Sequence, residues 1–435
     1  MDLIVSLVGW LFGEGFFLIK SVFFLGFILQ VLPIMIWLER KGSAYIQDRP
    51  GPQRAAAFGM IRMGGFIHNI ADVVKLLFKE DVTPRNVTQP FYTLAPMIPW
   101  FVSLCTYVVV PFGDYIIING VRHDLIAADL DSGLLFFLAI GSLGVYGVML
   151  AGWASNSKYS LLGGLRSTAQ LISYEISMGL ALVVVFMIFD SVQLSQIVRA
   201  QSGSILNWGV ASVPGFIAFI LFTTATFAET NRNPFDLPEG ESELVAGFHT
   251  EYSSFKFALF FMAEYANMIV AGAVIATLFL GGYQIPFITT EHIVHNPNTF
   301  SKLFLLATPV TAYWAWSGLK LLGQKRYGDA RDYEAPFWGA VFAGVTLAIL
   351  GLGLAPMWEY NDTTRTLLAF MLQFGAFVAK TMFFAWLFIW VRWTLPRFRY
   401  DQLMRLGWNY MLPVSLANIL LAGTWILIFP NGLLG

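Results

Sequence analysis

Long apolar runs, each about 20 residues, recur along the chain and dominate its pattern. A helix needs about 20 apolar residues to cross the hydrocarbon layer of a membrane. The pattern therefore predicts an all-α polytopic membrane protein, with residues 1–435 forming a single transmembrane domain. Ten such runs predict ten membrane-spanning helices, near 16–38, 93–112, 133–153, 172–190, 211–228, 257–281, 303–322, 337–357, 367–391 and 410–430.

Lysine and arginine are unevenly distributed among the polar connections between these runs. Five connections carry from two to eight basic residues, and the four that alternate with them carry one each. Basic residues collect on the cytoplasmic side of a membrane protein, so the richer connections are predicted to be cytoplasmic and both termini to face outward. The richer connections are 39–92, 154–171, 229–256, 320–336 and 392–409.

The connection 39–92 contains a pattern of its own. In FIHNIADVVKLLFKE, at 66–80, apolar side chains lie on one face of a helix, while His68, Asp72 and two lysines lie largely on the other. This arrangement predicts an amphipathic helix at the membrane interface. A helix packed on neighbouring spans is the alternative. The basic residues before it form a surface that suits anionic lipid and an acidic partner subunit equally well.

Composition agrees with a membrane protein and narrows its chemistry. Hydrophobic residues make up 57% and charged residues 12% of the chain, whereas about 25% charge is usual in soluble domains. The net charge of −1 argues against a nucleic-acid role, which needs a basic face. The single cysteine, Cys105, cannot hold an iron–sulfur cluster, and the five histidines are not paired for haem. His292 and His295 are interpreted as loop residues, so no metal site is predicted.

Acidic residues are concentrated in one part of the chain. Seven carboxylates lie in the 36 residues from Glu229 to Glu264, and in that stretch only Arg232 and Lys256 oppose them. An acidic residue at membrane depth is costly unless it is paired, wet or protonated, so such residues usually mark a proton or ion path. Glu229 and Glu264 lie inside apolar sequence, which favours this interpretation. The EGESE segment between them is typical of an exposed turn, within the acidic loop 229–256.

Four blocks rich in charged and polar residues interrupt the apolar sequence. They are LERKGSAYIQDRPGP with ADVVKLLFKED at 38–81, GWASNSKYSLLGGLRSTAQLISYE at 152–175, ETNRNPFDLPEGESELVAGFHTEYSSFKFALFFMAEYANM at 229–268, and LPRFRYDQLMRLGWNYMLP at 395–413. With these blocks the chain resembles the H subunit of respiratory complex I, the proton-pumping NADH:quinone oxidoreductase, equivalent to the first mitochondrially encoded subunit. The resemblance covers roughly residues 10–283 and 367–430.

The resemblance implies a subunit at the junction of the membrane arm and the peripheral arm, in contact with subunits of both arms and with lipid. There it would form much of the chamber in which quinone, either ubiquinone or menaquinone, approaches an iron–sulfur cluster of a neighbouring subunit. The chain itself would bind no flavin, haem or iron–sulfur cluster. The host membrane would be an energy-transducing one, the inner membrane of a bacterium.

The resemblance also implies roles for individual residues. The chamber would be lined by Glu39, Arg40, Arg49, Asp72, Arg232, Phe235, Asp236, Glu239, Glu241 and Glu264. A proton path toward the antiporter-like subunits would contain Glu175, Glu229, Glu243 and Glu251, with Arg166 and Arg399 as candidate charge partners. Anchoring at the membrane interface by snorkelling is the alternative role for the two arginines.

The chain departs from the family pattern at 284–366, where an inserted pair of spans is predicted in place of a short loop. Such a pair leaves the orientation of the later spans unchanged.

Three other functions remain open from the sequence. One is an equivalent subunit of a ferredoxin-fed or hydrogenase-linked relative, although the segments ETNR, PFDL and EGESEL favour the quinone-linked branch. Another is a secondary transporter, although the acidic stretch is not repeated and no matched pair of broken helices is evident. The third is a purely structural anchor, which would give no reason for Glu175, Glu229 and Glu264 to lie at membrane depth.

Overall fold

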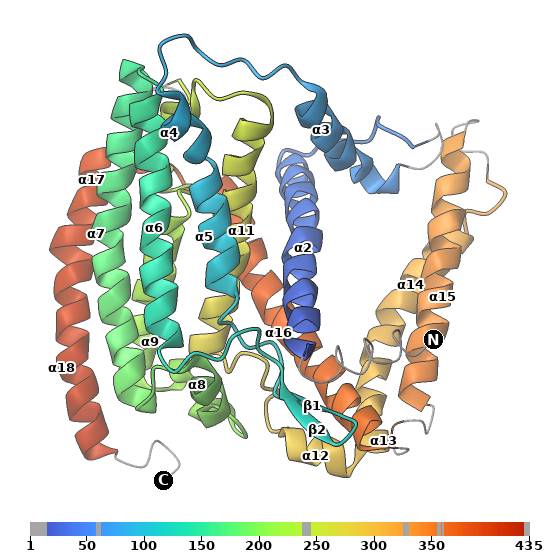
Figure 1. Ribbon diagram of the computed structural model, residues 1–435. Helices are drawn as coiled ribbons and strands as arrows, with labels where there is room; N and C mark the ends of the chain where they lie inside the picture. The colour runs from blue at the N-terminus through green and yellow to red at the C-terminus, as the bar shows by residue number, and fades with distance from the viewer. Residues whose placement is uncertain are drawn as a thin grey trace.

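The computed structural model describes residues 15–57, 62–236, 245–324, 330–354, 358 and 361–429. Within them, seven helices are long and apolar enough to cross a membrane, and Figure 1 shows most of them standing roughly side by side. The seven are α2 (Phe16–Ile46), α6 (Gly133–Ala154), α7 (Lys158–Phe189), α11 (Ser254–Phe279), α15 (Glu334–Leu354), α16 (Asp362–Thr394) and the continuous helix Tyr400–Ile428. The last combines α17 (Tyr400–Arg405), a π-helical turn (Leu406–Met411) and α18 (Leu412–Ile428).

The other three predicted spans form shorter helices, so the predicted number of ten is not confirmed. The run 93–112 contains α4 (Gln89–Leu94) and α5 (Met97–Tyr107). The run 211–228 is α9 (Val213–Glu229), and the run 303–322 is a 3-10 segment (Ser301–Ala307) followed by α14 (Thr308–Leu319). Proline accounts for two of the interruptions, because Pro96 precedes α5 and a proline opens α14. Proline lacks the N–H that would continue a preceding helix.

The core of the molecule surrounds α11, the most buried of the seven candidate spans. This helix packs against α2, α5, α9 and α16. Residues from sequence positions more than 300 apart therefore meet at one helix, which is what allows the charged residues near the ends of α2 and α16 to come together.

The two ends of the helical bundle carry different elements. Figure 1 shows α3 (Ile67–Phe78) at one end, and strands β1 (Tyr115–Ile118) and β2 (Val121–Asp124) with α8 (Leu194–Ala200), α12 (Thr290–His295) and α13 (Pro297–Phe300) at the other. The beginning of α2 and the end of α18 both lie at the end that carries the strands. Short 3-10 turns complete the described structure at Met63–Gly65, Ile205–Asn207, Gly209–Ala211, Gly247–His249 and Ala330–Tyr333.

The β-hairpin was missing from the sequence-based prediction. Its strands pair in antiparallel register from Tyr115 opposite Asp124 to Ile118 opposite Val121. The connecting residues Asn119 and Gly120 have φ values of 52° and 80°. An Asn-Gly pair suits a tight hairpin turn because both residues accept positive φ, and this signal could have predicted the hairpin.

The amphipathic helix is present as α3, and its apolar side is exposed. Phe78 is 87% exposed, and Ile70, Val73, Val74 and Leu77 are exposed as well. An exposed apolar face on a helix at one end of a membrane bundle favours the interfacial interpretation over packing on neighbouring spans.

The inserted segment forms a helical hairpin of α14 and α15. Gly318 and Gly339 bring the two backbones together, since a Cβ atom on Gly318 would lie 2.6 Å from the Cα of Gly339. Figure 1 shows this pair standing beside α2 and α16 at the edge of the molecule. At the end that carries the strands, the insertion joins α16 through a small apolar cluster of Ile293, Trp358 and Leu368.

Candidate functional site

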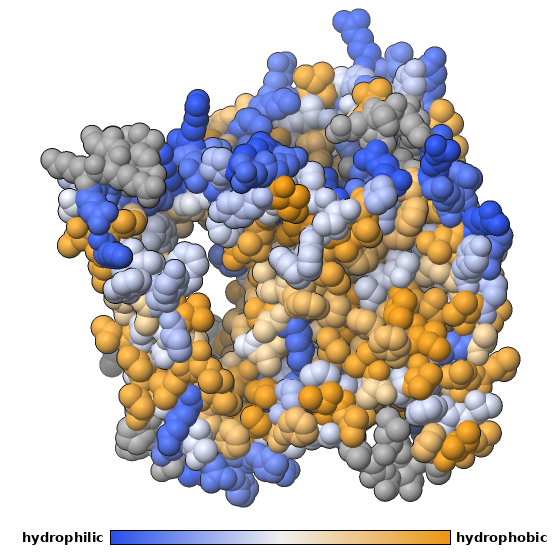
Figure 2. All heavy atoms as spheres, turned by 180° about the vertical axis from the view of Figure 1, so that it is seen from behind, coloured by the Kyte–Doolittle hydropathy of each residue, from blue (hydrophilic) through white to orange (hydrophobic). Residues whose placement is uncertain are grey.

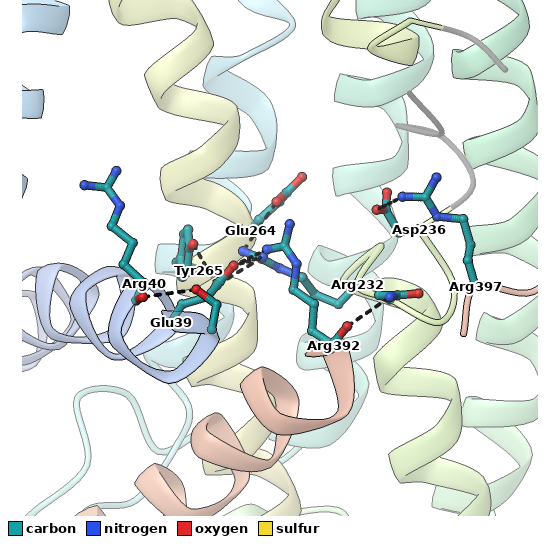
Figure 3. Close-up of polar contacts among 10 residues, drawn as sticks. Glu39, Arg40, Arg232, Asp236, Glu264, Tyr265, Arg392 and Arg397 are labelled. Carbon is teal, nitrogen blue, oxygen red and sulfur yellow. Dashed lines mark hydrogen bonds and ion pairs between the residues drawn. The ribbon is translucent and has the colours of Figure 1, made fainter. Parts of the chain in front are cut away.

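A buried cluster of charged residues lies where α2, α11, α16 and the segment after α9 meet (Figure 3). Glu39 of α2 and Arg232, just beyond α9, are 6% and 3% exposed. The Nη1 of Arg232 donates to both carboxylate oxygens of Glu39, at 3.4 and 3.5 Å. The hydroxyl of Tyr265 donates to the same carboxylate at 2.8 Å, and Arg392 of α16 donates to it as well.

Arg232 connects this cluster to a second carboxylate. Its Nη2 lies 3.6 Å from Oε2 of Glu264, one residue before Tyr265 on α11. The guanidinium of Arg232 also lies over the ring of Tyr265, 4.4 Å from the ring centroid. Removing a charge from water is expensive unless a partner compensates it. Two arginines and two carboxylates gathered in one place meet that requirement.

Asp236 forms a separate ion pair beside the cluster, in which the carboxylate is buried and the arginine is partly exposed (Figure 3). One of its oxygens lies 2.9 Å from Nη2 of Arg397. Arg232 and Lys256 are therefore not the only cations that oppose the acidic residues of this stretch. Lys256 pairs with Asp81 at 2.8 Å, and Arg392 and Arg397 supply counter-charges from the other end of the chain. A count confined to neighbouring sequence could not detect them.

The segment that carries Arg232 and Asp236 is held from α7. The side-chain amide of Gln170 donates to the backbone carbonyls of Ala228 and Phe235, at 2.8 and 2.9 Å. The ring of Phe235 packs between Tyr174 and Phe398, with centroids 5.4 Å away in each case. These contacts fix the backbone on both sides of Arg232, so its position does not depend on its ion pairs alone.

Glu175, Glu229 and Glu264 line one cavity, together with Asn267 and Ser142. Its volume is about 80 Å³, which is enough for roughly two or three water molecules at about 30 Å³ each. The three carboxylates that the sequence indicated at membrane depth thus meet in one space, on α7, α9 and α11. Glu264 belongs to both groups, because it lines the cavity and contacts Arg232.

A second hollow lies at the end of α2 that faces α3. It is open, has a volume of about 580 Å³, and is lined by Arg40, Arg49 and His68 among others. Nη1 of Arg40 lies 2.5 Å from Oδ2 of Asp72 on α3. Four of the predicted chamber residues therefore belong to one end of the molecule, with Glu39 turned inward and Arg40, Arg49 and Asp72 at the surface.

The remaining predicted acidic residues belong to the acidic loop 229–256. Glu239, Glu241 and Glu243 lie outside the described residues. The backbone carbonyl of Glu251 accepts a hydrogen bond from Tyr92 at 2.7 Å, next to the stacked rings of Tyr92 and Tyr252. Burial raises the pKa of the Tyr252 hydroxyl, so this aromatic pair stays neutral.

The two arginines proposed as charge partners lie near each other at α17. The guanidinium of Arg166 lies 5.9 Å from the ring centroid of Tyr400. Arg399, the residue before Tyr400, is exposed and forms no ion pair with the described part of the chain. Arg392 and Arg397, which contact the buried carboxylates of Glu39 and Asp236, were missed as site residues. The basic connection 392–409 was a signal for them, but it did not reveal which residue points inward.

Comparison with known proteins gives one consistent result. The family model described as NADH dehydrogenase matches residues 19–423. An H subunit of the NADH-quinone oxidoreductase of Solibacter usitatus, the one numbered 1, is 43% identical over 410 residues, which cover 93% of this chain and 95% of the relative. The H subunit of the Leptospira biflexa enzyme is 41% identical over 422 residues, 95% of each chain. The eighth subunit of the Rhodothermus marinus enzyme is 42% identical over 404 residues, 92% of this chain and 94% of the relative.

Proposed function

The chain belongs to the NADH dehydrogenase family, and on this premise we propose that it forms a quinone chamber and the beginning of the proton path that leaves it. It is a membrane subunit of a NADH-quinone oxidoreductase and carries no complete active site of its own. Family membership sets aside a self-contained transporter and a purely structural anchor.

The chamber is formed by the residues around the end of α2. Arg40 and Arg49 line the open hollow, and Glu39 and Arg232 lie buried behind it. A guanidinium donates hydrogen bonds in a fixed planar arrangement, which suits the carbonyl oxygens of ubiquinone or menaquinone. Phe235 and Asp236 complete the inner side, with Glu239 and Glu241 on the acidic loop. Electrons would come from the partner subunits of the peripheral arm.

The coupling proposal rests on one observation: Glu264 both contacts Arg232 of the buried cluster and lines the cavity that contains Glu175 and Glu229. Reduction of a quinone takes up two protons, and the change in charge acts first on the cluster of Glu39, Arg232 and Arg392. Arg232 lies 3.6 Å from Glu264. At that separation an ion pair is worth on the order of 4 kcal/mol in a medium of effective dielectric constant about 20. A movement of Arg232 would therefore alter the proton affinity of Glu264 and, through the cavity, that of Glu229 and Glu175.

The path then continues toward antiporter-like subunits of the membrane arm. Glu243 and Glu251 contribute to it, and Arg166 and Arg399 provide positive charge near its cytoplasmic side. The chain crosses the bacterial inner membrane ten times in this proposal, with α5, α9 and α14 as the three shorter crossings. The beginning of α2 and the end of α18 lie at the same end of the molecule, which supports an even number of crossings between them. The inserted pair lies at the periphery, against lipid or a neighbouring subunit.

The chamber is tested by removing its surface arginines in the assembled complex. Arg40→Gln and Arg49→Gln should each raise the apparent KM for a short-chain quinone by about ten-fold, the effect of losing one charge-assisted hydrogen bond. Electron transfer from NADH to an artificial acceptor on the peripheral arm should not change. Lys158→Gln is the matched control, because Lys158 is an exposed cation outside the hollow. An unchanged KM in both arginine variants would refute the chamber assignment.

A further inference from the structure

The inserted hairpin of α14 and α15 contacts the rest of the molecule mainly at its two ends. At one end, the backbone N–H of Gly64 donates to a carboxylate oxygen of Glu334 at 3.2 Å. At the other end, the cluster around Trp358 joins it to α16. Figure 2 shows an opening between these attachments, passing between the hairpin and the main body. In the described structure, α14 and α15 pack principally on each other and on the 3-10 segment before them.

The opening lies beside α15, one of the candidate spans. Figure 2 shows hydrophobic residues below it, and hydrophilic or intermediate residues above it and beside it, toward the α3 end. The candidate span α15 is the least buried of the seven, and Phe337, Val341 and Val345 are exposed on it. A protein interior does not leave space of this size empty, because lining atoms would lose their dispersion contacts. In a bilayer, the acyl chains of lipids would fill this opening.

A polar pocket lies at the α3 end of the same hairpin. Its volume is about 410 Å³, and its lining includes Arg62, Gln53, Gln324, Asp332, Glu334 and Trp338. The Nε of Arg62 is buried and has no hydrogen-bond partner among the described residues. Buried donors are almost always satisfied, so an unsatisfied one indicates a missing acceptor. The pocket therefore holds a guanidinium with one N–H that lacks an acceptor. Its lining also contains the carboxylate of Glu334, which can accept further hydrogen bonds.

We propose that this pocket and the opening below it bind one phospholipid whose zwitterionic headgroup carries a primary ammonium, a phosphatidylethanolamine. The phosphate accepts from the guanidinium of Arg62. The ammonium donates to the carboxylate of Glu334, and the acyl chains lie between the hairpin and α2. The charges select this headgroup, since phosphatidylglycerol has no cation for this carboxylate and a choline group has no N–H to donate. The lipid would fix the hairpin against the body of the subunit.

The test uses the intact complex reconstituted in vesicles that contain a trace of phospholipid with a photoreactive acyl chain. Three tracers are compared, with ethanolamine, glycerol and choline headgroups, and labelled peptides are located by mass spectrometry. The ethanolamine tracer should label α2 and the hairpin more strongly than the other two tracers. Arg62→Gln should lower that labelling by about ten-fold, as expected for the loss of a charge-assisted hydrogen bond.

Lys320→Gln is the matched control, because Lys320 is an exposed cation of the same insertion that does not line the pocket. It should keep wild-type labelling. Equal labelling in the two variants would overturn the proposal, as would equal labelling by the three tracers in the wild-type complex. Crosslinking of a photoreactive residue at Val341 to a helix of a neighbouring subunit would also overturn it. If Arg62→Gln does not assemble, the comparison of headgroups in the wild-type complex decides alone.

Discussion

Glu39→Gln removes one negative charge from the buried cluster and nearly preserves its shape. Glu39 accepts hydrogen bonds from Arg232, Arg392 and Tyr265. The amide has only one oxygen to accept them, and its NH₂ group faces guanidinium donors. Arg232 keeps its contact with Glu264, whereas Arg392 loses its contact with a carboxylate. The substitution should therefore leave an excess of buried positive charge.

The size of the effect follows from burial. The side chains of Arg232 and Glu39 are 4% and 8% exposed, and removing one partner of a buried pair costs about 3–5 kcal/mol. Arg40 and Asp72 at the surface provide the contrast, with side chains 42% and 33% exposed. The same carboxylate-to-amide change at Asp72 should cost about 0–1 kcal/mol.

The assay is the rate at which the purified complex loses quinone reductase activity at one elevated temperature. A lowering of the barrier by about 3 kcal/mol raises that rate by about a hundred-fold, and about 1 kcal/mol raises it by roughly five-fold. Glu39→Gln should raise the inactivation rate by nearly a hundred-fold, and Asp72→Asn by less than about five-fold. Adding Arg392→Met to Glu39→Gln removes one of the stranded positive charges, so the double variant should recover about 0.5–3 kcal/mol relative to additivity.

Two results would refute this reasoning. Equal inactivation rates for Glu39→Gln and Asp72→Asn would mean that burial does not determine the cost. Strict additivity of the Glu39 and Arg392 substitutions would mean that the two side chains do not interact as the geometry requires.

Further predictions concern the frame around the site. The ammonium of Lys380 donates to three backbone carbonyls beyond the end of α11, so Lys380→Met should cost about 1–3 kcal/mol and speed heat inactivation; an unchanged rate would contradict this. Gly318→Leu should separate α14 from α15, since Gly339 leaves no room for a side chain, and a distance probe across the hairpin would detect it. Reporter fusions at the two chain ends should both report the outer side of the membrane; a cytoplasmic signal from one would refute an even number of spans. Deleting residues 300–366 with a short relinking loop should damage assembly more than quinone reduction, and a fully assembled complex without quinone reduction would contradict that.

Hydrophobic length predicted the fold best where an apolar run is continuous. The runs that became α6, α11 and α16 contain no proline, and each forms one long apolar helix. The run 93–112 is equally apolar, but Pro96 divides it, and hydropathy alone does not measure where a helix stops. The β-hairpin was overlooked because its strands have only four residues each, too few to stand out among long apolar runs.

The sequence predicted the acidic residues of the candidate site but not the arginines that pair with them. Glu175, Glu229 and Glu264 stood out because a carboxylate in apolar sequence is costly, and the structure brings these three together in one cavity. Arg392 and Arg397 lie more than 120 residues from any of them and near a membrane surface, where basic residues are expected anyway. Their role depends on α16 crossing α11 close to α2. Sequence periodicity contains no information about that crossing.

The most direct test of the coupling proposal is Glu264→Gln in the assembled complex. The amide can still fill the position but cannot relay a proton as a carboxyl group can. Quinone reductase activity and proton translocation should fall together, while electron transfer from NADH to an artificial acceptor is kept. Glu291→Gln, an exposed acid at the opposite end of the molecule, should leave all three at wild-type values. Normal quinone reduction with normal proton stoichiometry in Glu264→Gln would contradict the account.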